Sequence, residues 1–217
     1  MLYNSNTPAQ NVSDAIIQQT FAQLNRDYNK TNTELNSARS VVQPIAVNTE
    51  IQFCLAQRDP NGATLATPGI TRKATTKSCW DRNTEADDMK YNSTGGDNAW
   101  NPLSYLNIWI VSICGTNPQT GGVAGYSYIA SVGNGLHGQS YDGIVIDYSI
   151  GLGNSNSTLT HEVGHYLGLY HTWGTQATNA CGTTVPTLDD GFSDTPDSRQ
   201  PHTNCTASAS CTGNSAY

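Results

Sequence analysis

The spacing of apolar positions changes along the chain and predicts two helices separated by strands. Between residues 14 and 28 apolar side chains recur every three or four positions, which predicts an amphipathic helix with Ser13 as its N-cap. A second helical segment, capped by Ser157 or Thr158, continues through residue 167. After His171 no period remains, because Gly, Thr, Asp, Pro and Cys dominate. We therefore expect two helices and an irregular C-terminal tail.

Other apolar segments are typical of strands. Residues 50–56 alternate in polarity and end in Asp-Pro-Asn-Gly turn chemistry. Residues 105–114 are the most apolar run and predict a central strand, and residues 143–148 predict another buried one. Residues 124–131 follow a Gly-Gly turn and predict an edge strand. Leu2 and Tyr3 look like the tail of a further strand, while residues 29–44 and 64–100 predict loops with short regular pieces.

This order of elements predicts a mixed α/β (α+β) fold with helices packed on a sheet. The chain has 217 residues, which suits one domain with a sizeable core. Charged residues make up 12%, the net charge is −7, and no Lys/Arg cluster occurs. A phosphate backbone would be repelled, and no apolar run is long enough to span a bilayer. We expect no nucleic-acid partner and no membrane span.

The chain contains six cysteines, and no two of them form a Cys-x-x-Cys pair. Disulfides in an oxidising compartment are therefore favoured over metal thiolates, which indicates secretion or a periplasm. For Cys54, Cys79 and Cys114 the pattern leaves two alternatives open. Two of the three are linked, or all are buried free thiols in neighbouring strands.

One stretch, residues 161–171, concentrates three of the five histidines. His161 and His165 are four apart, so a helix places both imidazoles on one face, where they can take two corners of a zinc tetrahedron. Gly168 tolerates positive φ and can return the chain, which would deliver His171 as a third ligand. Glu162 lies about 100° further round the helix and can reach a water on the metal.

This set of residues predicts hydrolysis of an amide bond, with a peptide as the expected substrate. Zinc held by three neutral imidazoles lowers the pKa of its bound water to about 7. Glu162 would accept the proton of that water and pass it to the leaving amine, as general base and then acid.

The motif HEVGHYLGLYH resembles the extended zinc motif of the metzincin metallopeptidases. Within that group, FCLAQRDPNG, YLNIWI, DGIVID, HTWG and DDGFSDTP are similar to the pappalysin family, in particular its ulilysin-like members. These matches run through nearly the whole chain in order. The resemblance implies a secreted zinc endopeptidase, for which we expect a peptide or protein substrate and a monomer.

The same resemblance implies a fold and a substrate cleft. The fold is a twisted, mostly parallel five-stranded sheet with an antiparallel edge strand, a backing helix and an active-site helix. The edge strand would line the cleft, and its free backbone groups could pair with an extended peptide. Its candidate residues are Gly125, Tyr126, Ser127 and Tyr128.

Metzincins place a methionine turn downstream of the third histidine, whereas this chain has only Met1 and Met89, both upstream. The resemblance therefore predicts one catalytic domain cut at both ends, with residues 1–168 as its N-terminal lobe and 169–217 as a partial C-terminal lobe. The alternative function is a non-catalytic binding module or an impaired fragment on the same scaffold. A zinc hydrolase of a non-peptide amide is a third possibility.

Two further features come from the family pattern. It pairs Cys181 with Cys211 and places the partner of Cys205 beyond the chain. Pappalysin relatives also bind calcium near the acidic turn after residue 188, which suits an ion that takes six to eight oxygens. The candidate calcium ligands are Asp189, Asp190, Asp194 and Thr195. The other histidines, His137 and His202, stand in polar loops and are expected to be exposed.

Overall fold

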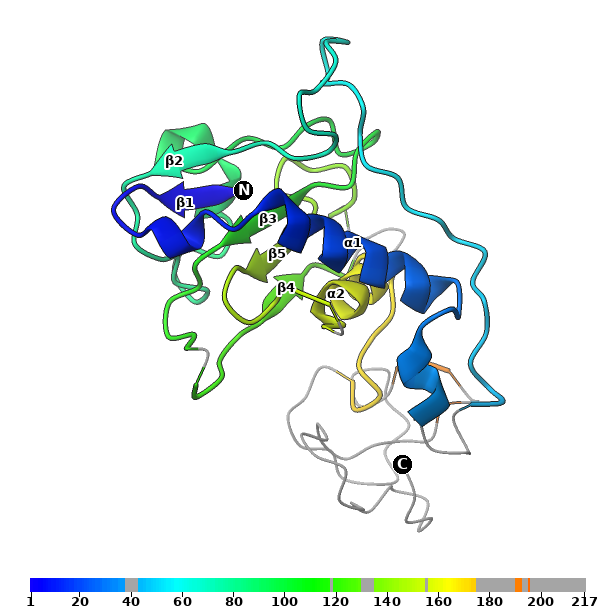
Figure 1. Cartoon of the computed structure of the whole chain (residues 1–217). Helices are drawn as coiled ribbons and strands as arrows, with labels where there is room; N and C mark the ends of the chain where they lie inside the picture. Colours follow the sequence, from blue (N-terminus) through cyan, green and yellow to red (C-terminus); the bar gives the residue numbers. More distant parts are fainter. Residues whose placement is uncertain are drawn as a thin grey trace. The chain divides into compact units, whose positions relative to one another are not determined.

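The structure is a computed structural model that describes residues 1–37, 43–117, 119–129, 135–154, 156–174, 190–192 and 195. The chain divides into two compact units, residues 1–166 and residues 167–217. All helices and strands of the described residues belong to the first unit (Figure 1). His202, Cys181, Cys205 and Cys211 lie outside the described residues.

Helix α1 spans Asp14–Tyr28 and confirms the first predicted helix. The Ser13 side chain accepts a hydrogen bond from the N–H of Ile16, which satisfies one of the orphan donors of the first turn. Thr20 and Leu24 are buried on one face of the helix. The predicted N-cap is therefore the residue that begins the helix.

Helix α2 spans Thr158–Tyr166 and confirms the second predicted helix. Three short 3₁₀ helices among the described residues lie in the segments predicted as loops with short regular pieces, and they span Thr33–Ser37, Asp88–Lys90 and Asn92–Thr94. A further one, Pro8–Gln10, lies ahead of α1 and was not predicted.

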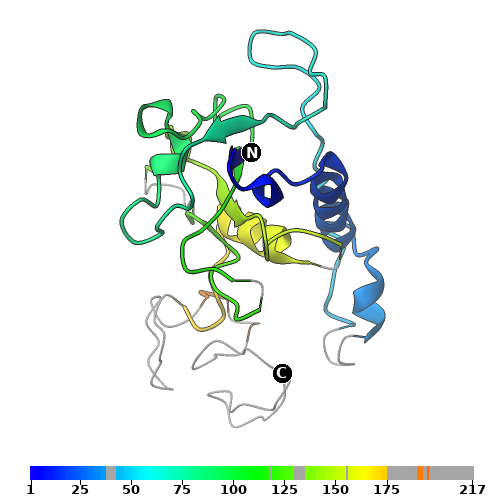
Figure 2. The ribbon, with the colours of Figure 1, turned by 60° about the vertical axis from the view of Figure 1, so that its left-hand side comes forward.

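Three strands form the sheet beneath the helices. β3 (Ile108–Val111) pairs in parallel with β5 (Ile144–Asp147), and β4 (Gly125–Ser127) pairs antiparallel to β5. The strand order is β3-β5-β4, so β4 is the predicted antiparallel edge strand. The central strand of this sheet is β5 and not β3, so the prediction of a central strand at residues 105–114 is wrong in its position. A separate parallel pair joins β1 (Leu2–Asn4) and β2 (Lys73–Thr75), and Figure 2 shows the two side by side. The mixed, mostly parallel architecture is confirmed, but the described strands form two sheets rather than one.

The predicted strand at residues 50–56 is wrong, because the segment belongs to neither sheet. A side chain takes the place of a neighbouring strand there. The amide of Asn25 in α1 accepts a hydrogen bond from the Phe53 N–H at 2.9 Å and donates one to the Phe53 carbonyl at 3.1 Å. The alternation of polar and apolar residues at 50–56 thus belongs to a segment that pairs with no neighbouring strand.

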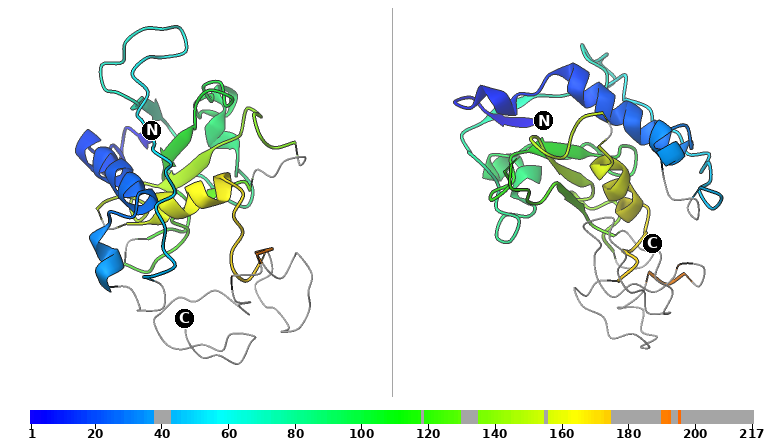
Figure 3. Two further views of the ribbon diagram at one scale, coloured as in Figure 1. Left: turned by 90° about the vertical axis from the view of Figure 1, so that its right-hand side faces the viewer. Right: turned by 60° about the horizontal axis from the view of Figure 1, so that its bottom comes forward.

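Apolar clusters cover both faces of the three-stranded sheet, because alternate side chains of β5 point in opposite directions. Ile144 and Ile146 belong to the cluster that includes residues of α1 and α2. Val145 belongs to the other cluster, with Trp80, Met89 and Trp109. Both helices therefore pack on one face, an arrangement that can be followed in Figure 3.

A disulfide joins Cys79 to Cys114 and settles the cysteine alternatives in favour of one link. It lies next to a parallel bridge in which Trp80 pairs with Ile113. Cys54 is exposed and carries a free thiol. The loop that precedes β3 is thereby tied to the end of that strand.

Candidate metal centre and active site

Helix α2 brings the two predicted histidine ligands together. The Nε2 atoms of His161 and His165 lie 3.0 Å apart, and their rings meet edge to face with centroids separated by 4.5 Å. His165 is buried, whereas His161 is exposed. Partial burial of the imidazole, together with the nearby His165, lowers the pKa of His161. Low pKa favours the neutral form, which is the form that binds a metal.

The first turn of α2 is held by the other helix. The carboxylate of Asp27 in α1 accepts hydrogen bonds from the Thr160 hydroxyl at 2.6 Å and the Ser157 hydroxyl at 3.3 Å. The Asn156 side chain accepts a further one from the Thr158 N–H at 2.9 Å. A carboxylate near a helix N-terminus also complements the positive end of the helix dipole. These contacts fix the position of the helix that carries the histidines.

Glu162 is buried on α2 against strand β4. A Cβ built on Gly125 of β4 would lie 3.1 Å from Cγ of Glu162 and 2.9 Å from the carbonyl oxygen of Val145. Only glycine therefore allows the helix to approach this strand so closely. Burial raises the pKa of Glu162 to about 7, and the charge of Arg82 opposes that rise.

The chain leaves α2 through Gly168, whose φ of +101° confirms the predicted left-handed residue after the helix. His171 follows and stacks on Trp173, with ring centroids 4.4 Å apart. The ligand atoms of His161, His165 and His171 all lie within 4.8 Å of one another. Three imidazole nitrogens at this spacing suit zinc, whose ligands in a tetrahedron of about 2.0–2.1 Å bonds are about 3.3 Å apart. The residues present therefore fit the metal that the motif predicts.

Strand β4 contains three of the predicted cleft residues, Gly125, Tyr126 and Ser127, and Tyr128 follows directly. All are half-buried. The Tyr126 hydroxyl donates to the carbonyl of Ala86 at 2.8 Å, and the Tyr128 hydroxyl donates to the Asp87 carboxylate at 2.7 Å. The two tyrosines thus tether the strand to residues 86–87.

Lys90 completes this tether and was not predicted. Its side chain is 1% exposed, and its ammonium lies 3.0 Å from the Asp87 carboxylate and donates to the Tyr141 carbonyl at 2.7 Å. The same ammonium lies over the rings of Trp109 and Tyr128. Burial lowers the pKa of Lys90, and Asp87 opposes the shift. A lysine in a polar, aperiodic segment carries no sequence signal for such a role.

The predicted calcium site falls mostly outside the described residues, because Asp189 and Asp194 are not among them. Asp190 is buried and accepts a hydrogen bond from the Phe192 N–H at 3.0 Å. The N–H of Thr195 donates to the Phe192 carbonyl. This is the geometry of a local turn, so the calcium ligands stay a prediction. The exposed His137 lies 3.2 Å from the Asp142 carboxylate.

Residues 89–217 match the peptidase family described as pregnancy-associated plasma protein-A. An extracellular metalloprotease of Podospora anserina is 29% identical over 184 residues, which cover 81% of this chain and 52% of the relative. The chain thus spans about half the length of that curated relative. Among the described residues no helix is long and apolar enough to cross a membrane.

Solved structures of Tannerella forsythia proteins share the fold. Mature mirolysin in complex with a cleaved peptide is 34% identical, with a TM-score of 0.75 over 91% of this chain and 69% of that one. A promirolysin mutant is also 34% identical, with a TM-score of 0.74 over 90% of this chain and 60% of that one. Together with the metzincin motif, these matches show that the chain belongs to the pappalysin family of metzincin zinc metallopeptidases.

Proposed function

We propose that this protein is a secreted zinc endopeptidase whose metal is held by His161, His165 and His171. The observation that carries the proposal is the convergence of three imidazole nitrogens within 4.8 Å, next to a carboxylate buried between α2 and β4. Secretion is supported by the Cys79–Cys114 disulfide and by the extracellular relative.

Glu162 is the catalytic acid and base in this proposal. Bound zinc supplies a Lewis acid that polarises the scissile carbonyl and acidifies the attacking water. The carboxylate of Glu162 takes the proton from that water and returns it to the nitrogen of the leaving amine. Its burial against Gly125 keeps bulk water from the carboxylate and fixes its direction.

The substrate in this proposal is an extended peptide that lies along β4. One edge of β4 pairs with β5, and no strand among the described residues pairs with its other edge. Open backbone groups at such an edge can bind a peptide main chain. The hydrogen bonds of Tyr126 and Tyr128 hold the strand in place from the side of residues 86–90. A related structure, mature mirolysin, was obtained with a cleaved peptide.

The remaining assignments extend the same proposal. Residues 1–168 belong to an N-terminal lobe and residues 169–217 to a C-terminal lobe of one catalytic domain, which acts as a monomer. Calcium is bound by Asp189, Asp190, Asp194 and Thr195 and stabilises the C-terminal lobe. A disulfide between Cys181 and Cys211 does the same.

The test compares the 217-residue chain with its Glu162→Ala variant in cleavage of an unfolded protein. We expect chelator-sensitive cleavage by the chain, a loss of about 10²–10⁴-fold in the variant, and one zinc per chain in both by elemental analysis. Glu50→Ala is the matched control, because Glu50 is an exposed glutamate remote from α2 in sequence. His165→Ala should lose the zinc itself.

The outcomes separate the rival functions. Unchanged cleavage by Glu162→Ala would overturn the mechanism. A chain that holds zinc but cleaves no peptide is the non-catalytic module. A chain that hydrolyses only small amides is the non-peptide hydrolase.

A further inference from the structure

Arg82 carries a guanidinium that no other described residue binds. Every other lysine or arginine among the described residues donates a hydrogen bond or forms an ion pair. Arg82 does neither within that part of the chain. Its guanidinium carbon instead lies 5.6 Å from the ring centroid of Tyr126, the middle residue of β4. At this distance the ring attracts the cation, so the free charge is held beside the strand proposed to bind substrate.

The ring of Tyr126 places this charge toward the open edge of β4. Tyr126 lies opposite Val145 of β5 in the register of the two strands, and Val145 is fully buried. The flank of the tyrosine that faces β5 is therefore occupied. Because Arg82 is exposed, its guanidinium lies on the flank that faces away from β5. No strand among the described residues pairs with β4 on that side.

The same charge acts on the other face of β4. Side chains alternate along a strand, so Tyr126 and Gly125 face opposite sides of the sheet. Tyr126 packs against the cluster that contains Trp109, whereas Glu162 packs against Gly125. The charge of Arg82 nevertheless opposes the rise in the pKa of Glu162. A cation that is felt on both faces lies beside the strand, where a substrate backbone would run.

The turn that carries Arg82 is held in place by hydrogen bonds at its two ends. The Trp80 N–H donates to the Ser112 carbonyl at 2.9 Å. The Glu85 N–H donates to the Asp81 carbonyl at 2.7 Å, and the Asp81 N–H donates to the Glu85 carboxylate at 3.1 Å. A side chain that projects from a fixed turn loses less conformational entropy when it binds a ligand.

Two carboxylates of the same segment are held by other cations. The carboxylate of Glu85 accepts a hydrogen bond from the ammonium of Lys77. The carboxylate of Asp87 lies 3.0 Å from the ammonium of Lys90 and accepts a hydrogen bond from the Tyr128 hydroxyl at 2.7 Å. Neither carboxylate pairs with the guanidinium beside Tyr126, which leaves that group available to an acid from outside the chain.

A peptide laid along β4 would pass next to this guanidinium. Every second side chain of such a peptide points to the face of the sheet that contains Tyr126. A carboxylate at that position can accept two parallel N–H bonds from a guanidinium. We propose that Arg82 is a specificity-determining residue that binds an aspartate or glutamate side chain of the substrate on this face. The inference rests on the proposed function, because it requires a peptide paired with β4.

The first test maps the cleavage sites of the 217-residue chain in a library of peptides from a digested proteome. Mass spectrometry of the products should show aspartate and glutamate enriched at one position relative to the cut bond. Arg82→Glu should favour lysine and arginine at that same position, because the charge of the contact is reversed. Arg82→Lys should keep most of the acidic preference, and the preferences at all other positions should not change.

Arg58→Glu is the matched control. Arg58 is an exposed arginine in the turn of residues 58–64, which Figures 1 and 2 show away from β4. Arg58→Glu and Arg82→Glu have the same net charge, so a comparison of the two removes the effect of the overall field of this acidic chain. The control should retain the acidic preference.

Kinetics with two peptides, which differ only by glutamate or lysine at the mapped position, measure the contact. The unchanged chain should prefer the glutamate peptide about three- to fivefold, the effect of an exposed ion pair. Relative to Arg58→Glu, Arg82→Glu should lower the ratio of glutamate to lysine peptide in kcat/KM by about tenfold. The change should be in KM, because the contact is remote from the reacting atoms. A purely structural role for Arg82 would instead lower kcat for both peptides alike.

Binding gives the answer if the chain cleaves nothing. The probes are acetyl-Ala-Glu-Val-Glu-Val-Glu-Ala-amide and its counterpart with lysine in place of glutamate, titrated by calorimetry into the zinc-loaded Glu162→Ala chain. The ratio of their affinities should fall about tenfold when Arg82→Glu is added, compared with the addition of Arg58→Glu. That result without any cleavage would support the contact and contradict the proposed endopeptidase.

Two results would overturn the role of Arg82. The first is active cleavage in which Arg82→Glu and Arg58→Glu share one preference profile, and in that case the proposed endopeptidase would stand. The second is an inactive chain that binds neither probe at millimolar concentration, or binds both with the same ratio in the two variants.

Discussion

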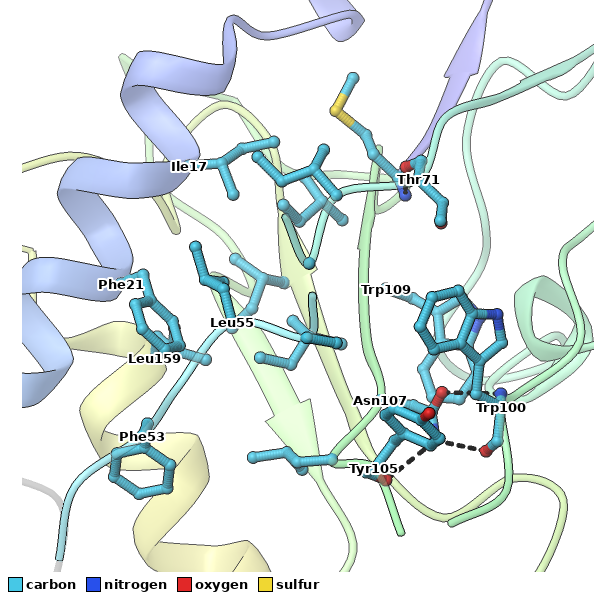
Figure 4. A pocket seen from close by; sticks show the side chains of 18 of the residues that line it. Ile17, Phe21, Phe53, Leu55, Thr71, Trp100, Tyr105, Asn107, Trp109 and Leu159 are labelled. Atoms are coloured by element: carbon cyan, nitrogen blue, oxygen red, sulfur yellow. Dashed lines mark hydrogen bonds between the residues drawn. The ribbon is translucent and has the colours of Figure 1, made fainter. Parts of the chain in front are cut away.

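The two edges of the three-stranded sheet are built in opposite ways. At the β4 edge, hydroxyls and charges fix the strand, through Tyr126, Tyr128, Asp87 and Lys90. At the β3 edge, apolar walls surround a cavity (Figure 4). The extended segment of residues 53–56 that borders this cavity is held at Phe53 by the Asn25 side chain and at Ala56 by the Gly69 N–H. β3 and β4 each pair with β5, which lies between them.

The difference shows how one sheet can offer two kinds of edge. Hydrogen bonds from the tyrosine hydroxyls are directional, so they hold β4 at one position beside the histidine helix. Apolar walls offer no directional partner, so the β3 edge is bounded by shape and hydrophobic burial instead. The β4 edge is therefore suited to a reaction that needs precise placement, and the β3 edge to stable burial.

The largest expected effect is at the β4 tether. In Lys90→Ala the Asp87 carboxylate loses a buried counter-charge, and space opens beneath Trp109 and Tyr128. The free energy of unfolding should fall by about 3–5 kcal/mol in urea titrations. Lys30→Ala, which removes an exposed ammonium bonded to the Ala46 carbonyl, should cost less than about 1 kcal/mol. Equal small losses in both variants would show that Lys90 does not hold the edge.

A smaller effect is expected where α2 meets β4. In Gly125→Ala the new methyl would lie 2.9 Å from Cδ1 of Ile146 and from the Val145 carbonyl oxygen. The helix or the strand must shift, at a cost of about 1–3 kcal/mol, and Glu162 shifts with it. Ser127→Ala in the same strand should cost less than about 1 kcal/mol, since it adds no atom. Wild-type stability in Gly125→Ala would contradict the close approach.

The smallest effect is expected at the opposite edge. Ala56 lines the cavity beside β3, so the two extra methyls of Ala56→Val enter free space. Unfolding free energy should stay the same or rise by up to about 1 kcal/mol. A loss above about 2 kcal/mol in urea would show that the cavity is closed in solution.

Much of the site was predictable because its residues are neighbours in sequence. The spacing of His161 and His165 is a property of any α-helix, and Gly168 adopts the positive φ expected after the helix. Ser13 likewise caps α1 through contacts three residues away. Local geometry of this kind depends little on the rest of the fold.

The errors and omissions come from contacts between distant segments. Residues 50–56 have the alternation of a strand, but pairing depends on a partner, and Asn25 from α1 occupies that position. The sequence left open whether two of Cys54, Cys79 and Cys114 are linked, and the pairing of Trp80 with Ile113 brings the linked residues Cys79 and Cys114 together. The polar composition of residues 64–100 also gave no indication that the side chain of Lys90 is buried.

The amino-acid sequence by itself determined the two helices, the histidine motif with its glutamate, and the family, because each is encoded by short-range periodicity or by ordered local matches. Only the tertiary structure decided that Gly125 admits Glu162 beside β4, that Lys90 and two tyrosines tether that edge, and that the β3 edge opens into an apolar groove. These features join residues far apart in the chain, and their energies depend on burial and distance, which periodicity does not encode.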